Sequence, residues 1–197
     1  GIDHDYCSGG DMRFVDLNGD HQITDADRTF IGDPNPKAYG NVFTSLSYKR
    51  FRLDANFNYC LGNDVFNYQR QQLESGSRFI NQTTAMLQRW QSEGDQTSMP
   101  RVSFQDPMGN SRFSDRWIED GSYFHLKTVT LSYTLPVHTS YLQGLEFWVQ
   151  ANNVFTLTKY LGSDPEFAVT SSVIGQGIDA GQLPQSRSFV AGVKINL

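Results

Sequence analysis

One short segment of this chain has the oxygen-bearing side chains of a calcium-binding loop at the right spacing. Within residues 16–27, such side chains occupy loop positions 1, 3, 5 and 12, and they are Asp16, Asn18, Asp20 and Asp27. Gln22 stands at position 7, where the backbone carbonyl is the usual ligand. Calcium takes six to eight hard oxygen ligands, and this spacing curls them around one point. The segment therefore predicts Ca²⁺ as a cofactor.

Two features of this loop differ from the helix–loop–helix pattern. The glycine is Gly19 at position 4, while position 6 is His21, and position 12 holds Asp27 instead of the longer glutamate. The Asn-Gly-Asp run resembles dockerin loops, whereas the shorter Asp27 predicts weak binding. No helix clearly enters the loop, so a solvated turn stabilised by its own Asp and Asn side chains remains an alternative.

Other chemistry is sparse along the chain. The histidines are scattered and are interpreted as satisfied or solvated side chains: His4, His21, His125 and His138. The acid pairs Asp25/Asp27 and Glu119/Asp120 are typical of surface turns. Three aromatic residues near the middle of the chain could stack on sugar rings, although packing within a loop is the commoner role: Trp90, Trp117 and Tyr123. We expect no enzymatic activity.

The elements that must position these residues are β-strands, because apolar and polar residues alternate along the chain. Five strands are expected, at about 39–49, 51–61, 122–135, 144–157 and 186–197. In the last strand, Phe189, Val193, Ile195 and Leu197 share one side, while Lys194 and Asn196 lie on the other. Each strand is about ten residues long, the length that a tilted strand needs to cross a bilayer.

The connections between these strands alternate between short and long. Short turns are expected near 49–51 and 136–143, and long segments at 1–38, 62–121 and 162–185. Outer-membrane barrels have short periplasmic turns and long extracellular loops. Residues 1–38 are therefore predicted to be an extracellular loop that carries the calcium-like segment, and 39–197 to form the barrel strands.

The long segment 62–121 contains one expected helix. Apolar residues recur at helical spacing across 78–91, which predicts one short amphipathic helix in this loop. The two cysteines, Cys7 and Cys60, are as consistent with two thiols as with one bridge.

Composition excludes several classes of protein. The formal net charge of −5 argues against a nucleic-acid partner, which requires a basic surface. No apolar run reaches the roughly 18 residues of a membrane helix. Alternation cannot say whether the apolar face meets lipid or a protein core, so a soluble β-sandwich remains an alternative to a barrel.

Seven segments, read in order, resemble one known family. They are 10–20 (GDMRFVDLNGD), 27–37 (DRTFIGDPNPK), 62–67 (GNDVFN), 116–123 (RWIEDGSY), 126–136 (LKTVTLSYTLP), 152–156 (NNVFT) and 184–189 (PQSRSF). This run is similar to the C-terminal part of SusC/RagA-family TonB-linked outer-membrane transporters, and it covers nearly the whole chain.

The resemblance implies a 22-stranded barrel with a plugged lumen, of which five strands would be a segment. The expected fold is thus all-β, with antiparallel up-and-down strands in the wall of a transmembrane barrel. Family members import glycans or peptides across the outer membrane, with energy passed by TonB and with a surface lipoprotein of the SusD type as a lid. The expected partners are these two proteins and outer-membrane lipid, TonB acting on a region outside this chain.

Two other functions remain open at this stage. A secreted, calcium-dependent β-sandwich that binds glycans is the main alternative. A hydrolase has the least support, because no cluster of catalytic residues is recognisable.

Overall fold

A computed structural model describes residues 2–3, 9–137, 139, 141–167 and 175–196. The chain forms two compact units. The first comprises Gly1–Asp33, Val65–Glu119 and Ile178–Gly181, and the second comprises Pro34–Asp64, Asp120–Gly177 and Gln182–Leu197.

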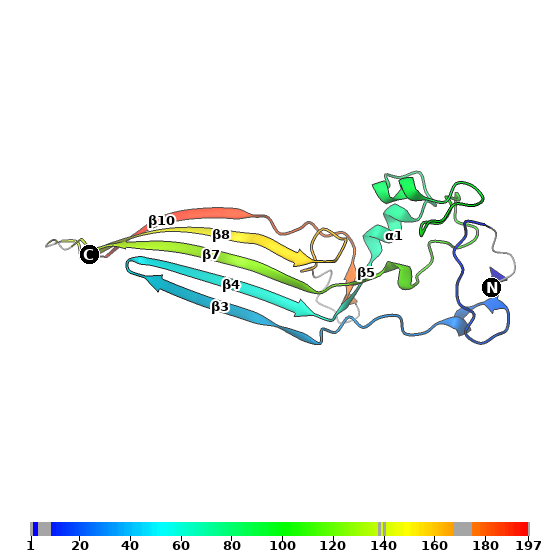
Figure 1. The fold of residues 1–197 in the computed structure, drawn as a ribbon, viewed down its shortest axis with the longest axis horizontal. Coiled ribbons are helices and arrows are strands. Elements are labelled where there is room, and N and C mark those ends of the chain that lie inside the picture. Colours follow the sequence, from blue (N-terminus) through cyan, green and yellow to red (C-terminus); the bar gives the residue numbers. More distant parts are fainter. Residues whose placement is uncertain (1, 4–8, 138, 140, 168–174, 197) are drawn as a thin grey trace. The chain divides into compact units, whose positions relative to one another are not determined.

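The second unit contains one antiparallel sheet of five long strands (Figure 1). The strands are β3 (Ala38–Tyr48), β4 (Phe51–Leu61), β7 (Tyr123–Leu135), β8 (Gly144–Thr158) and β10 (Ser188–Asn196). Their order in the sheet is β10-β8-β7-β4-β3, so each long strand pairs with the next one along the chain. This confirms the prediction of an all-β, up-and-down architecture.

Two short connections meet at one end of this sheet, which we call the turn end. Lys49 and Arg50 alone join β3 to β4, and Lys49 adopts the left-handed φ of 54° that so tight a turn requires. Residues 136–143 join β7 to β8, and the Gln143 amide donates to the Asn196 carbonyl at the end of β10 (2.8 Å). The opposite end, where the long connections begin, is the loop end.

The two faces of the sheet differ in chemistry because side chains alternate along each strand. One face, which we call the outer face, is apolar and exposed; among its residues are Val42, Leu46, Phe51, Leu53, Leu131, Phe147, Val149, Val193 and Ile195. Leu46 is 62% exposed and Val149 is 53% exposed. A β-sandwich would bury such a face under a second sheet, and no described segment covers it. The predicted sides of the last strand agree with its register, and Leu197 lies outside the described residues.

Bulges interrupt the ladders near the loop end. The register between β4 and β7 shifts at Asn56/Phe57, and that between β7 and β8 shifts between Leu126 and Thr128. Opposite Lys127, β8 carries two residues, Asn153 and Val154, and Asn153 has a left-handed φ of 52°. A bulge changes which face a residue meets. Lys127 and Thr128, although consecutive, thus share the inner face.

The first unit consists of short elements. Besides the pair β1 (Ile2–Asp3) and β2 (Gln22–Ile23), it contains η2 (Asp25–Asp27), α1 (Tyr68–Glu74), η3 (Thr84–Gln88) and η4 (Asp115–Trp117). A small sheet orders β6 (Ile118–Asp120), β5 (Asp64–Asn67) and β9 (Ile178–Asp179), with β5 and β9 parallel. Its most buried apolar side chains are Trp117 and Val65, and Met86 and Met99 are also buried.

The helix predicted over 78–91 is wrong. That segment contains only the 3-10 turn η3, and the α-helix of the loop is α1, which precedes it. The apolar residues at helical spacing do not share a buried face, because Met86 is buried while Phe79 is 91% exposed and Leu87 is 73% exposed.

Among the described residues, no helix is long and apolar enough to cross a membrane. Cys60 is a free thiol, and Cys7 lies outside the described residues.

Candidate functional site

The inner face of the sheet carries a connected set of neutral polar side chains. Gln150 accepts a hydrogen bond from Thr130 (3.2 Å) and donates to Asn152 (2.7 Å), which in turn donates to Ser188 on β10 (3.0 Å). On the same face, toward the β3 edge of the sheet, Asn41 donates to Asn58 on β4 (2.6 Å). These amides and hydroxyls can each donate and accept, so the face offers hydrogen bonds to water or to a polar solute.

A buried histidine marks the loop end of this inner face. His125 on β7 is 2% exposed, and its Nδ1 lies 2.8 Å from Oε2 of Glu166. Lys127, displaced by the bulge, donates to the other Glu166 oxygen (3.0 Å) and to Gln185 (3.0 Å). Glu166 and Gln185, two residues of the connection between β8 and β10, are thereby bonded to β7.

The Glu166 carboxylate is stabilised in its charged form. Partial burial opposes ionisation, but hydrogen bonds from His125 and Lys127 outweigh burial and lower the pKa of Glu166. We call the contacts of Glu166 with His125 and Lys127 the tether. Because the folded-state pKa of Glu166 is depressed, the tether contributes stability above the ordinary glutamate pKa. That contribution is lost as the pH falls through the folded-state value.

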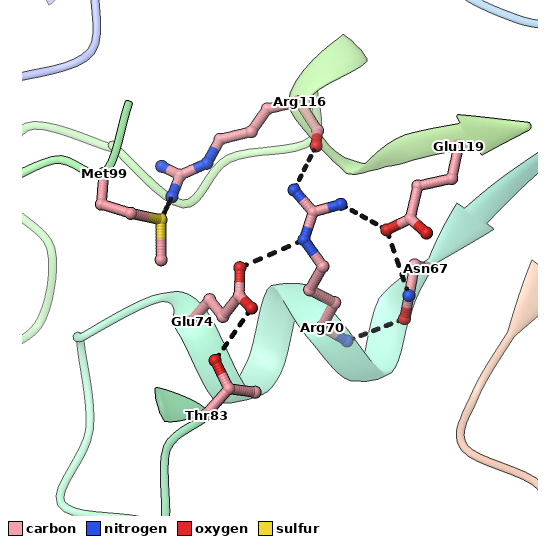
Figure 2. Close-up of polar contacts among 7 residues, drawn as sticks. All are labelled: Asn67, Arg70, Glu74, Thr83, Met99, Arg116 and Glu119. Carbon is pink, nitrogen blue, oxygen red and sulfur yellow. Dashed lines mark hydrogen bonds and ion pairs between the residues drawn. The ribbon is translucent and has the colours of Figure 1, made fainter. Parts of the chain in front are cut away.

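In the first unit, the guanidinium of Arg70 on α1 is the centre of a buried polar network (Figure 2). It donates through Nε to Glu74 (3.1 Å), through Nη1 to Glu119 on β6, and through Nη2 to the Arg116 carbonyl (2.9 Å). The side chains of Arg70, Glu74 and Glu119 are 19%, 8% and 9% exposed. Burial opposes the charge of Arg70, yet the hydrogen bonds and charges of Glu119 and Glu74 raise its pKa.

Neighbouring residues complete the network. Asn67 caps α1 by accepting from the Arg70 amide (2.9 Å) and donates to Glu119 (3.2 Å), and Thr83 donates to Glu74 (2.9 Å). The Arg116 guanidinium lies 4.5 Å from the Trp117 ring centre, an attractive cation–π geometry. Both carboxylates are engaged by Arg70, so the cluster is suited to holding the loop together and not to acid–base chemistry.

This network was not expected from the sequence, and one of its members was predicted to lie elsewhere. Glu119 was expected in a surface turn, but it is nearly buried because Arg70 neutralises it. The Arg70–Glu74 spacing of four residues and the capping Asn67 were visible signals of a helix at 68–74. The partner Glu119 is about fifty residues away in sequence, and only the fold brings it close.

The calcium-like loop is held by its own side chains. The His21 and Gly19 amides donate to Asp16 (2.9 and 2.7 Å), and the Thr24 and Leu17 amides donate to Asp27 (2.7 and 2.9 Å). These hydrogen bonds lower the pKa of both carboxyl groups, so both are ionised at neutral pH. Asp27 also closes the capping box of η2 together with Thr24.

The remaining predicted ligands make local contacts. Asn18 accepts from the Asp20 amide (2.9 Å), and Asp20 accepts from the Gln22 amide (2.8 Å). Nowhere in the described part of the chain do three His, Cys, Asp or Glu side chains converge enough to hold a metal ion. The donor set is chemically suited to calcium, since it consists of ionised or amide oxygens, but the three carboxylates do not meet at one point in this arrangement.

Other residues singled out from the sequence have structural surroundings. Trp117 is fully buried, and the Trp90 ring lies against Gly10, whose added Cβ would come within 2.4 Å of it. Packing is therefore the observed role of both rings. His4 and His138 lie outside the described residues.

The chain is similar to known proteins over nearly its whole length. It is 33% identical over 195 residues to TonB-dependent receptor P3 of Formosa agariphila. The matched region covers 95% of this chain and 19% of that receptor. It is 26% identical to TonB-dependent receptor P39 of the same organism, again over 95% of this chain. The chain thus spans about a fifth of the length of these relatives. No protein-family model matches it.

Solved structures agree with these relatives. The RagAB peptide importer in its open-open state superposes with a TM-score of 0.74 at 26% identity, covering 90% of this chain and 19% of that chain. The RagAB peptide transporter gives 0.74 at 27% identity, covering 89% of this chain. Likeness in both sequence and fold extends across the sheet and the loops.

Replacing Arg70 with alanine should destabilise the first unit by about 3–5 kcal/mol, because Glu74 and Glu119 would remain buried without a counter-charge. Hydrogen exchange of the amides in 65–119 measures this free energy of local unfolding. Arg28→Ala is the matched control. Its ion pair with Asp25 has side chains 81% and 86% exposed, so its loss should change the free energy by less than about 1 kcal/mol. Equal effects of the two substitutions would contradict the structural role of Arg70.

The tether at Glu166 should weaken in acid. Hydrogen exchange at 161–167 is expected to speed up, relative to its intrinsic rate, as the pH drops below about 4.3, the ordinary glutamate value. Glu166→Gln cannot titrate at this position and should lack that transition. A transition of the same size in both proteins would show that Glu166 is not its source.

Proposed function

We propose, from the premise that this chain belongs to the SusC/RagA family of TonB-linked outer-membrane transporters, that its five long strands form part of the wall of a nutrient importer. The outer face of the sheet would contact lipid and the inner face would line the lumen. The proposal assigns no enzymatic activity to the chain.

The observation that carries this proposal is the arrangement of the outer face in rows. At the turn end, cross-strand pairing aligns Tyr48, Phe51, Tyr133, Phe147 and Val193, which we call the turn-end row. Toward the loop end, Tyr59, Phe124 and Leu157 align in a second row rich in aromatic residues. Between the two rows the outer face is mainly aliphatic.

The separation of the rows matches a bilayer. A strand rises about 3.4 Å per residue, so the path from Phe51 to Tyr59 on β4 is about 27 Å long. A strand tilt of roughly 40° reduces this to about 21 Å, close to the apolar band of about 25 Å that aromatic girdles flank in outer-membrane barrels. The short turns then lie on the periplasmic side.

The localisation follows from the family, since TonB-dependent receptors and RagA-type transporters are outer-membrane proteins. We infer that the cargo is a glycan or a peptide, that TonB supplies the energy and that a surface lipoprotein of the SusD type acts as partner. Support comes from the receptor names of the relatives and from the peptide importer RagAB. The amides and hydroxyls of the inner face can hydrogen-bond to either cargo.

Import should depend on the side of the sheet that carries a charge. In the full-length transporter, Val129→Arg places a cation on the lipid face midway between the two rows and should cost about 2–4 kcal/mol, whereas Val193→Arg, in the turn-end row, should cost only about 0–1 kcal/mol. Lys194→Arg, one residue further on the inner face, should change little. The measurements are heat-modifiable mobility of the barrel and growth on oligosaccharides or on peptides as sole nutrient.

Three outcomes separate the parts of this proposal. Loss of assembly in Val129→Arg alone supports the lipid-facing assignment. Growth on one nutrient that requires both the transporter and TonB identifies the cargo class. If Val129→Arg assembles and imports as well as Lys194→Arg, the outer face does not meet lipid.

We further propose that Asp16, Asn18, Asp20, the Gln22 carbonyl and Asp27 bind one calcium ion. The support is the ligand spacing together with the ionised state of Asp16 and Asp27. Because the carboxylates do not converge in the present arrangement, binding would require Asp20 to exchange its hydrogen bond with Gln22 for the ion.

Calorimetry on the chain should detect calcium with a dissociation constant of about 10⁻⁴–10⁻³ M, the range of weak extracellular sites. Asp16→Ala should abolish the heat signal. The control is Asp25→Asn, which removes a nearby exposed acid outside the ligand set. Flat traces for the parent chain would refute calcium binding and leave the importer proposal unaffected.

A further inference from the structure

An apolar groove crosses the outer face of the sheet near the turn end. It has a volume of about 430 Å³ and runs over β4, β7, β8 and β10. Its side chains on this face include Phe51, Leu131, Tyr133, Phe147, Ala191 and Val193. Ala191 is the smallest of them and lies beside Val149 in the register, so the surface dips there between larger neighbours.

Aromatic rings form the wall of the groove on the side of the turns. The rings of Phe51 and Tyr133 pack with centroids 4.8 Å apart, and Phe147 is the cross-strand partner of Tyr133. All three belong to the turn-end row, where aromatic side chains sit at headgroup depth in a membrane. The groove therefore opens toward headgroups at one end and toward acyl chains at the other.

Two cations stand directly beside that opening. Lys49 and Arg50 form the two-residue turn that precedes Phe51, and Lys49 Nζ lies 5.3 Å from the centre of the Tyr48 ring. Neither side chain has a carboxylate partner within the part of the chain that the structure describes. The neighbouring turn, 136–143, contains no acidic residue. This local positive charge contrasts with the net charge of −5 for the whole chain.

We propose that this groove and the Lys49–Arg50 turn bind one anionic phospholipid of the inner leaflet. The acyl chain lies along the groove over Ala191, and the headgroup phosphate is held by the two cations. Charge complementarity selects the occupant, because a lysine or arginine at a membrane surface attracts anionic lipid. The inference rests on the proposed function, which puts the turn end on the periplasmic side.

The test uses the full-length transporter in nanodiscs that contain phosphatidylcholine and phosphatidylglycerol, followed by detergent extraction and native mass spectrometry. The parent should retain one phosphatidylglycerol in preference to phosphatidylcholine. The double variant Lys49→Gln/Arg50→Gln should lose that preference by a factor of about five or more, given the attraction of each cation. Ala191→Phe fills the groove without changing charge and should reduce retention of both lipids.

The matched control is Lys159→Gln, which removes a cation that follows β8 at the loop end and should leave retention unchanged. Equal retention of the two lipids by the parent, or unchanged preference in the double variant, would overturn the lipid site. A dimer that Ala191→Phe dissociates would show that a second copy covers the groove, which also overturns it. A transporter that does not insert into nanodiscs contradicts the proposed function instead.

Discussion

The pairing register of five long strands determines which environment each side chain meets. Side chains alternate between the two faces of a sheet, so a slip of one residue would exchange the apolar and polar sets of a whole strand. The two-residue turn at Lys49–Arg50 sets the register of β3 against β4, and the ladders carry it across to β10. The aromatic rows, the polar inner face and the groove over Ala191 all depend on this alignment.

The bulges adapt that regular sheet to its loops. At Lys127 the extra residue puts two consecutive polar side chains on the inner face, and the lysine reaches Glu166 and Gln185. On β8, the left-handed Asn153 donates to the Ser186 carbonyl (2.8 Å) just before β10 begins. The connection between β8 and β10 is thus anchored by polar contacts at the points where the ladders are interrupted.

The first unit is stabilised differently, because few of its apolar side chains are buried. Trp117 and Val65 provide its small core, and charges complete it. Arg70 divides its donors among two carboxylates and one carbonyl, so each buried charge has a partner. A second ion pair, between the buried Asp11 and the partly exposed Arg101, ties the N-terminal segment to the long loop (2.9 and 2.8 Å).

Local patterns in the sequence determined the five strands, their two faces and the turn at Lys49–Arg50, because alternation and turn chemistry involve residues close in the chain. The same holds for the ligand spacing of residues 16–27. Only the tertiary structure decided that Glu119 is buried against Arg70, that residues 78–91 form no α-helix and that Asp27 caps η2. It also decided where the ladders bulge. These features depend on partners from distant segments, or on which residues find a surface to pack against, and helical spacing alone cannot supply that surface.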